Sequence, residues 1–252
     1  MKQEWRENMR NNNETEVVLI RHAQSQWNWE NRFTGWADPA LTEAGICEAH
    51  TAGCALRQAG FRFDYGYTSR LQRAVHTLEI LQQELGQESL GTQQDWRLNE
   101  RHYGALQGKN KAETARLAGA EQVLRWRRGY LDLPAPLPPS DPAHPRNDPR
   151  YADIPAQLLP SFENLDITRE RVSAFWNEQA VPRLQRGERL LVSSHGNTLR
   201  ALIMELDGMS VAEVEAFEIP TATPIVYRFD SHGRPLGWHY LDVQAPCFDY
   251  AA

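Results

Sequence analysis

The chain has 252 residues, of which 41% are hydrophobic and 24% charged, with a formal net charge of −6. This composition is ordinary for a globular protein with a real core, and the length allows one large domain or two small ones. The acidic balance argues against nucleic acid as a partner, because a phosphate backbone selects basic surfaces. The sequence contains no run of about 18 apolar residues that could cross a membrane.

The amino terminus and the cysteines give two further expectations. Residues 1–16 are polar, lack the apolar segment of a secretory signal, and are predicted to be a disordered or frayed leader. Cys47, Cys54 and Cys247 match neither a disulfide framework nor a metal spacing. Cys47 and Cys54 lie seven residues apart and are predicted to be core residues on one helical face. A cytoplasmic location is the expectation that follows.

An apolar, β-branched run over 17–20 predicts the first buried strand, and it ends in Arg21 and His22. In open α/β sheets, ligands bind outside the carboxyl ends of the strands, so both side chains lie where chemistry can occur. Taken alone, His22 could equally be a structural histidine. A helix over 42–59 should follow, with Thr42 as its N-cap, and then a short strand over 61–67.

The next predicted helix runs to residue 85 and ends at Gly86. Ser69 and Gln72 match a capping box at its start. Arg73 falls in its first turn, where a cation opposes the helix dipole and gains most from a bound anion.

The middle of the chain carries a weaker strand over 92–99, which places Glu100 at a strand end, and one or two helices over 109–128. Nine of the fifteen prolines fall within 130–160. Proline removes backbone donors, so we expect a long loop there, and such loops inside compact domains are usually lids or linkers.

The last third resumes a helix and strand pattern. It predicts a helix over 167–184, a buried strand over 189–194, a helix over 199–206, a capping box at Ser210 and Glu213, and strands over 224–229 and 236–243. The strand over 189–194 leads directly into His195, Gly196 and Asn197.

Two strands therefore end in histidines, His22 and His195, and parallel strands bring such ends to one edge of the sheet. Asn197 lies where a helix begins, and helix N-termini favour phosphate. With Glu100 as a single acid among several cations, this set suggests phosphoryl transfer, in which catalysis consists mostly of positioning and charge neutralisation.

Several blocks also carry a resemblance. They are Arg21-His22 with Ser25 and Asn28, residues 32–36, Thr68-Ser69 with Arg73, His76 and Thr77, residues 98–108, residues 110–114, Trp126-Arg127-Arg128, and His195-Gly196-Asn197 with Leu199, Arg200 and Ala201. In order and spacing, from residue 17 to 241, the chain resembles the cofactor-dependent (2,3-bisphosphoglycerate-dependent) phosphoglycerate mutases of the histidine phosphatase superfamily. The blocks 32–36 and 98–108 are the most specific, because the superfamily at large does not share them.

The resemblance implies an α/β fold, a three-layer α/β/α sandwich with a mostly parallel mixed sheet. Residues 17–245 would form a single catalytic domain with a proline-rich excursion or lid over 130–165, and 246–252 a short C-terminal tail. Members of this family form dimers and tetramers, so a homo-oligomer is expected.

The implied activity is the interconversion of 3-phosphoglycerate and 2-phosphoglycerate through a phosphohistidine, primed by 2,3-bisphosphoglycerate and without a metal. His22 would be the nucleophile and Glu100 the general acid and base. Arg21, Arg73 and His195 would hold the phosphoryl group. The implied substrate-binding residues are Asn28, Thr34, Gly35, Tyr103, Lys111, Arg127, Arg128, Gly196 and Asn197.

Three departures from the family pattern stand out. Ala23 and Gln24 replace the usual glycine and glutamate after the histidine, and the chain ends without the usual lysine- and glycine-rich tail. Ala23 fits if its φ is negative, which we predict. Because a short tail leaves a phosphohistidine open to water, a phosphatase using the same histidine is the alternative. A silent binding protein that only keeps the fold is the third.

Overall fold

The computed structural model describes residues 14–243, which form one six-stranded mixed sheet with the strand order β3-β2-β4-β1-β5-β6. The strands are β1 (Thr15–Arg21), β2 (Tyr65–Thr68), β3 (Thr92–Gln94), β4 (Leu190–Ser194), β5 (Ile225–Phe229) and β6 (Pro235–Tyr240). The first four are parallel, and β5 and β6 are antiparallel to their neighbours. The predicted α/β fold with a mostly parallel mixed sheet is confirmed.

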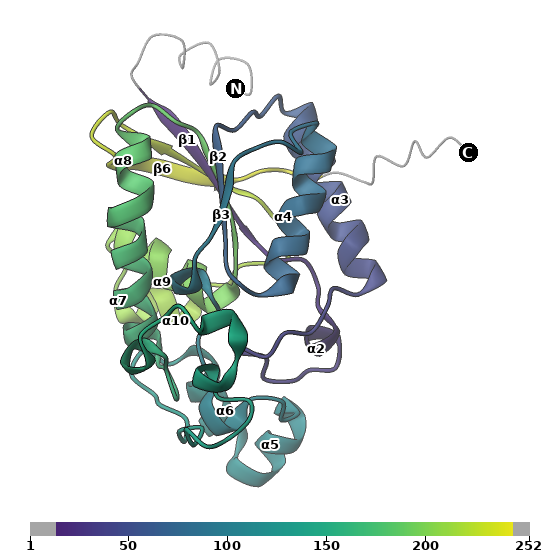
Figure 1. The fold of residues 1–252 in the computed structure, drawn as a ribbon, viewed down its shortest axis with the longest axis vertical. Coiled ribbons are helices and arrows are strands. Elements are labelled where there is room, and N and C mark those ends of the chain that lie inside the picture. Colours follow the sequence, from purple (N-terminus) through teal and green to yellow (C-terminus); the bar gives the residue numbers. More distant parts are fainter. Residues whose placement is uncertain (1–13, 244–252) are drawn as a thin grey trace.

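Helices cover both faces of this sheet, as Figure 1 shows. The alternation along β1 sets the two cores, since Val17 and Leu19 pack with one cluster and Val18 and Ile20 with the other. The first cluster takes in α7 (Leu165–Phe175) and α9 (Gly196–Asp207), and the second α3 (Glu43–Gln58) and α4 (Gln72–Leu85). These are the three layers that the resemblance implied.

The remaining helices follow the predicted order, except for the first, a short helix that no sequence pattern predicts. They are α2 (Gln26–Trp29), α5 (Lys111–Ala118), α6 (Ala120–Arg128), α8 (Val181–Leu184) and α10 (Val211–Ala216). A π-helical turn, Trp176–Ala180, joins α7 to α8 immediately before Pro182, which has no N–H to continue the α-helical ladder. Thr42 caps α3, Gly86 ends α4 and Ser210 forms the capping box of α10, all as predicted.

Four local predictions are wrong. Thr15 and Glu16, predicted to belong to the leader, lie in β1. The strand over 92–99 stops at Gln94 and passes into the 3-10 turn Trp96–Leu98, so Glu100 follows a turn and not a strand. Cys54 is buried in α3, whereas Cys47 is exposed, because helical spacing fixes the side of a residue but not how far neighbouring elements cover it. The fourth, at Ser69, belongs to the site below. Residues 1–13 and the tail predicted over 246–252 lie outside the described residues.

The proline-rich segment is fastened to the body of the protein. It contains three short 3-10 turns, and its Tyr151 packs with Trp36 at a ring-centroid distance of 4.8 Å. Ion pairs join Asp153 to Arg70 and Arg150 to Asp38. These contacts place the segment against the loops that lead to the site.

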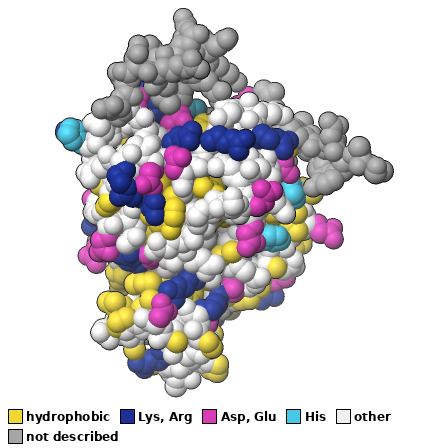
Figure 2. Space-filling view, turned by 45° about the horizontal axis from the view of Figure 1, so that its top comes forward, with side chains coloured by type: hydrophobic (Ala, Val, Ile, Leu, Met, Phe, Trp, Pro, Cys, Tyr) yellow, Lys and Arg dark blue, Asp and Glu magenta, His cyan; other side chains and the backbone are white. Residues whose placement is uncertain are grey.

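Charged and hydrophobic side chains are interspersed on the face in Figure 2, with hydrophobic ones gathered toward its lower end, where α5 and α6 lie in Figure 1. Among the described residues, exposed leucines on these two helices are Leu117 and Leu124. No helix within residues 14–243 is both long enough and apolar enough to span a membrane.

Candidate active site

His22 lies directly after β1 and is 97% buried, with its ring held from both sides. Its Nδ1 is 2.7 Å from the carbonyl oxygen of Ala23, which can only accept, so Nδ1 carries the proton of the neutral ring. Nε2 therefore carries the lone pair, and it accepts a hydrogen bond from the Nε–H of Arg73 at 3.2 Å. The tautomer leaves Nε2 as the nucleophilic nitrogen.

Burial lowers the pKa of His22 well below its usual value, and the positive charges of Arg73 and Arg21 lower it further. Burial has the same effect on the pKa of His195, and it lowers that of His102 to about 4. All three imidazoles are neutral at pH 7.

The lowered pKa values of these three histidines make the stability of the fold depend on pH. Because the folded-state pKa of His22, His195 and His102 is depressed, the unfolded chain binds these protons first, so stability is complete above about pH 6.5 and falls below it. We expect each histidine to cost about 1 kcal/mol of unfolding free energy between pH 7.5 and 5.5. Urea denaturation at the two pH values measures this. His102→Asn should remove about a third of this histidine contribution, and an unchanged pH dependence would contradict the assignment.

Two arginines flank His22. Arg73, at the start of α4, is buried, and its guanidinium donates to the carbonyl oxygens of Ala37 and Gly35, each at 2.8 Å. Gly35 adopts a φ of +54°, which turns its carbonyl toward Arg73. Arg21 donates from Nη1 to the carbonyl of Ile219 at 2.8 Å, while its buried Nε has no partner among the described residues.

His195 lies behind His22, with ring centroids 5.0 Å apart, and it does not line the cavity. Its Nε2 is 2.8 Å from the hydroxyl of Ser69, which already accepts from the backbone N–H of Leu71. Ser69 thus joins His195 to the start of α4. The buried Nδ1 of His195 has no partner among the described residues.

Ser69 is the position where the predicted capping box fails. The N-cap of α4 is Leu71, whose side chain has no polar atom with which to cap, and Ser69 lies two residues earlier, where its hydroxyl contacts His195 and accepts from the N–H of Leu71. The resemblance blocks contained Ser69, but no local pattern marked it as a site residue.

We expect Ser69→Ala to lower kcat about 10-fold, because His195 loses the hydrogen bond that holds its ring behind His22. Ser69→Thr keeps a hydroxyl and should retain most of the activity. Steady-state kinetics on the three proteins test this, with urea denaturation as a check on folding. Equal losses in both variants, or none in Ser69→Ala, would contradict the role of the hydroxyl.

Glu100 is held by its own backbone and by α9. Its Oε1 accepts from the backbone N–H groups of Arg101 at 2.8 Å and Asn197 at 3.2 Å. Its carbonyl oxygen accepts from Trp36 Nε1 at 2.6 Å and Arg171 Nη2 at 3.0 Å. The first turn of α9, where the sequence predicts phosphate, thus binds the Glu100 carboxylate through the N–H of Asn197. The second oxygen of this carboxylate, Oε2, is left for a proton transfer.

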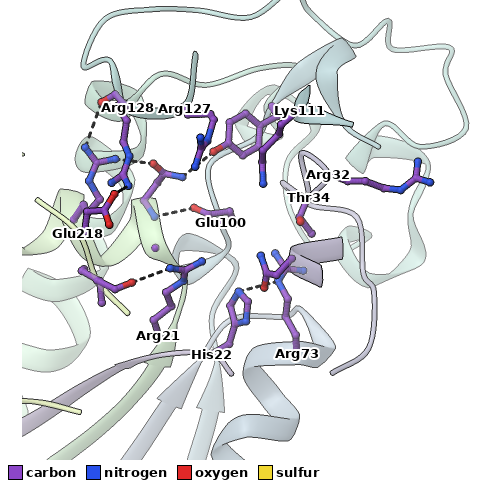
Figure 3. A pocket seen from close by; sticks show the side chains of 16 residues that line it. Arg21, His22, Arg32, Thr34, Arg73, Glu100, Lys111, Arg127, Arg128 and Glu218 are labelled. Carbon is purple, nitrogen blue, oxygen red and sulfur yellow. Dashed lines mark hydrogen bonds and ion pairs between the residues drawn. The ribbon is translucent and has the colours of Figure 1, made fainter. Parts of the chain in front are cut away.

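The opposite wall of the pocket is basic (Figure 3). Lys111 and Arg127 have no carboxylate partner among the described residues, and Lys111 Nζ lies 5.9 Å from the ring centroid of Phe33. Burial, then the charges of Arg127 and Arg21, lowers the pKa of Lys111 to about 8. Adjacent cations without a counter-charge favour an anionic ligand.

Together these residues enclose a cavity of about 130 Å³. Twelve of the fourteen sequence-predicted site residues line it: Arg21, His22, Asn28, Thr34, Arg73, Glu100, Tyr103, Lys111, Arg127, Arg128, Gly196 and Asn197. The other two do not line it: His195 lies behind His22, and Gly35 accepts from Arg73 through its carbonyl oxygen. The prediction of the site missed four lining residues, Arg32, Arg200, Glu218 and Ile219. Arg32 and Arg200 stood within the resemblance blocks, whereas Glu218 and Ile219 had no sequence signal.

The two substitutions after His22 are accommodated. Ala23 is fully buried, its backbone N–H donates to Thr77 Oγ1 at 3.1 Å, and its φ is negative as predicted, because the only non-glycine residues with positive φ among those described are Asn31 and Ala222. The Gln24 side chain accepts from Thr42 Oγ1 at 2.9 Å, which supports the N-cap of α3.

The fold thus places a neutral histidine and several arginines at the carboxyl edge of the parallel strands, and this combination defines the class of the protein. The family model of the histidine phosphatase superfamily (branch 1) matches residues 17–140 and 137–240. The chain belongs to the histidine phosphatase superfamily.

Solved structures agree on the fold. A phosphoglycerate mutase from Bacillus anthracis is 20% identical with a TM-score of 0.65, covering 91% of this chain and 92% of its own. An α-ribazole phosphatase from Shigella flexneri is 22% identical with a TM-score of 0.65, covering 91% and 95%. A mycobacterial glucosyl-3-phosphoglycerate phosphatase complexed with VO3 is 24% identical with a TM-score of 0.62, covering 91% and 98%. Both mutases and phosphatases therefore share this architecture.

Proposed function

We propose that this protein interconverts 3-phosphoglycerate and 2-phosphoglycerate, with the phosphoryl group carried on His22 Nε2. The observation that supports this most is the pairing of a neutral, lone-pair-bearing Nε2 with a second group of cations, Lys111 and Arg127, across the same small cavity. A substrate with an anion at each end fits both.

The reaction follows from these positions. The Nε2 lone pair attacks phosphorus, the N–P bond forms, and the bond from phosphorus to the ester oxygen breaks while Glu100 gives that oxygen a proton. In the second half, a substrate hydroxyl returns its proton to Glu100 as its oxygen takes the phosphoryl group. Arg21 Nε, which faces the cavity and has no partner among the described residues, would donate to the phosphoryl oxygens.

When bound, 2,3-bisphosphoglycerate would supply the phosphoryl group that loads His22. The residues present fit such a ligand, because Arg21, whose Nε has no partner among the described residues, lines the inner end, and Lys111 and Arg127, which have no carboxylate partner among those residues, line the outer end. Asn28, Thr34 and Tyr103, on the walls between, would contact its hydroxyl and carboxyl oxygens.

A phosphatase acting through the same histidine is the second candidate. The proline-rich segment supports this candidate, since none of the described residues from 130 to 165 lines the cavity. Two of the solved structures compared above are phosphatases. Water would then take the phosphoryl group in place of a substrate hydroxyl.

Mass spectrometry tests the shared step, and a coupled assay separates the two activities. Incubation with 2,3-bisphosphoglycerate should add one phosphate to His22, and 3-phosphoglycerate should remove it. For a mutase, 2-phosphoglycerate forms faster than inorganic phosphate is released. The reverse order would support the phosphatase, and an unlabelled His22 would overturn both.

A further inference from the structure

Glu218 reaches Arg128 at the rim of the cavity. It lies in the segment between α10 and β5, and its carboxylate forms an ion pair with Arg128 Nη2, drawn as a dashed line in Figure 3. The carbonyl oxygen of Phe217 accepts from Nη1 of the same arginine at 3.1 Å. Tyr240 Oη donates to the carbonyl oxygen of Glu218 at 3.1 Å, which fixes the backbone beneath the carboxylate.

This pairing distinguishes Arg128 from its neighbours on the wall. Lys111 and Arg127 have no carboxylate partner among the described residues, whereas Arg128 is paired and Arg32 is paired with Glu30. Both Glu218 and Arg128 line the cavity, so the carboxylate occupies the side of the guanidinium that a ligand anion would use. The Glu218 side chain is 75% exposed, so it can leave Arg128 without opening the fold.

We propose that Glu218 is a specificity-determining residue that competes with the second anionic group of a substrate for Arg128. A phosphoester that also carries a carboxylate or second phosphate must displace Glu218 and then lie beside its negative charge. A phosphoester with an uncharged far end meets neither cost. The basic wall favours doubly anionic substrates over singly anionic ones, and Glu218 thus reduces that preference. This inference rests on the proposed function.

Competition by Glu218 also fits a phosphoryl transfer in which the two ends of the ligand must exchange places in the cavity. An internal carboxylate that takes over Arg128 as the ligand anion leaves keeps the guanidinium paired at every stage. When the second anion of the ligand is released, the Arg128 guanidinium is then not left unpaired.

Calorimetric titration of the full chain with two probes of similar size tests the proposal. The first is 3-phosphoglycerate, which has a phosphate and a carboxylate, and the second is glycerol 3-phosphate, which has the phosphate alone. Glu218→Gln should bind 3-phosphoglycerate about 3- to 10-fold more tightly, with glycerol 3-phosphate unchanged. Glu205→Gln, which removes a similar exposed carboxylate from Arg169 away from the cavity, should change neither.

A second variant isolates the mechanism. In an Arg128→Gln background, Glu218→Gln should give no gain for 3-phosphoglycerate, because the guanidinium over which the two carboxylates compete is gone. Equal shifts for both probes, or no shift, would overturn the competition even if His22 is phosphorylated. A selective shift without a phosphohistidine would uphold the competition and reject the proposed function. Failure of both probes to bind would reject the two together.

Discussion

His22→Ala should lower kcat for phosphoryl transfer by about 10⁴- to 10⁶-fold and abolish the phosphoenzyme, because removal of a covalent nucleophile leaves only binding and electrostatic stabilisation. His22 is buried between Ala23 and Arg73, and no other histidine lines the cavity among the described residues. Substrate turnover and mass spectrometry of the intact protein provide the two measurements.

His76→Ala is the matched control for this substitution. His76 is exposed on α4, three residues from Arg73, so its loss should leave both turnover and the phosphoenzyme unchanged. If His22→Ala retained a phosphorylated histidine, or more than a tenth of the activity, the assignment of His22 as nucleophile would be wrong.

The largest stability effect is expected from Arg171→Met. Arg171 and Glu163 form a buried ion pair, with side chains 8% and 1% exposed and N–O distances of 2.7 and 2.8 Å. Arg171 also donates to the backbone carbonyls of Arg97, Asn99 and Glu100. Removing it leaves a buried carboxylate unpaired, so the free energy of unfolding should fall by about 3–5 kcal/mol.

Denaturation in urea measures this loss, and Arg169→Met serves as the comparison on the same helix. Arg169 pairs with Asp166 and Glu205 at the surface, and such pairs contribute about 1 kcal/mol or less. Arg171→Met combined with Glu163→Gln should recover part of the stability, since the buried charge is removed. If the two single variants differed by less than about 1 kcal/mol, the buried pair would not have the role assigned to it.

The same substitution should affect catalysis through Glu100. Its carbonyl is held by Arg171 and Trp36, and its carboxylate is aimed into the cavity from that backbone. A double variant that folds but lacks this anchor should show a lower kcat with little change in KM, because ligand binding depends on other residues.

Much of the site could be predicted from the sequence because it follows from the ends of strands. A buried apolar run that terminates in a histidine predicts both a strand and the edge at which its last side chain emerges, and two such parallel strands bring His22 and His195 together. The negative φ of Ala23 and the caps at Thr42 and Ser210 are also local properties of the backbone.

Choice of partner was decided only by the tertiary structure. Ser69 fits a capping box in sequence, yet His195, 126 residues away, takes its hydroxyl. Glu100 was expected at a strand end and instead follows a 3-10 turn, where Arg171 and Asn197 hold it. When a polar side chain has several hydrogen-bond partners within reach, it bonds the partner that burial has removed from water. Sequence spacing does not encode which partner that is.

The sequence by itself determined the order of strands and helices, the two histidines and the basic character of the pocket, since these depend on periodicity and residue type. The tertiary structure alone decided which cations remain unpaired. Lys111 and Arg127 face the cavity without a counter-charge from any residue of the described part of the chain, whereas Arg128 meets Glu218 from a segment 90 residues further along. Charge compensation depends on distance in space, and long-range packing sets that distance.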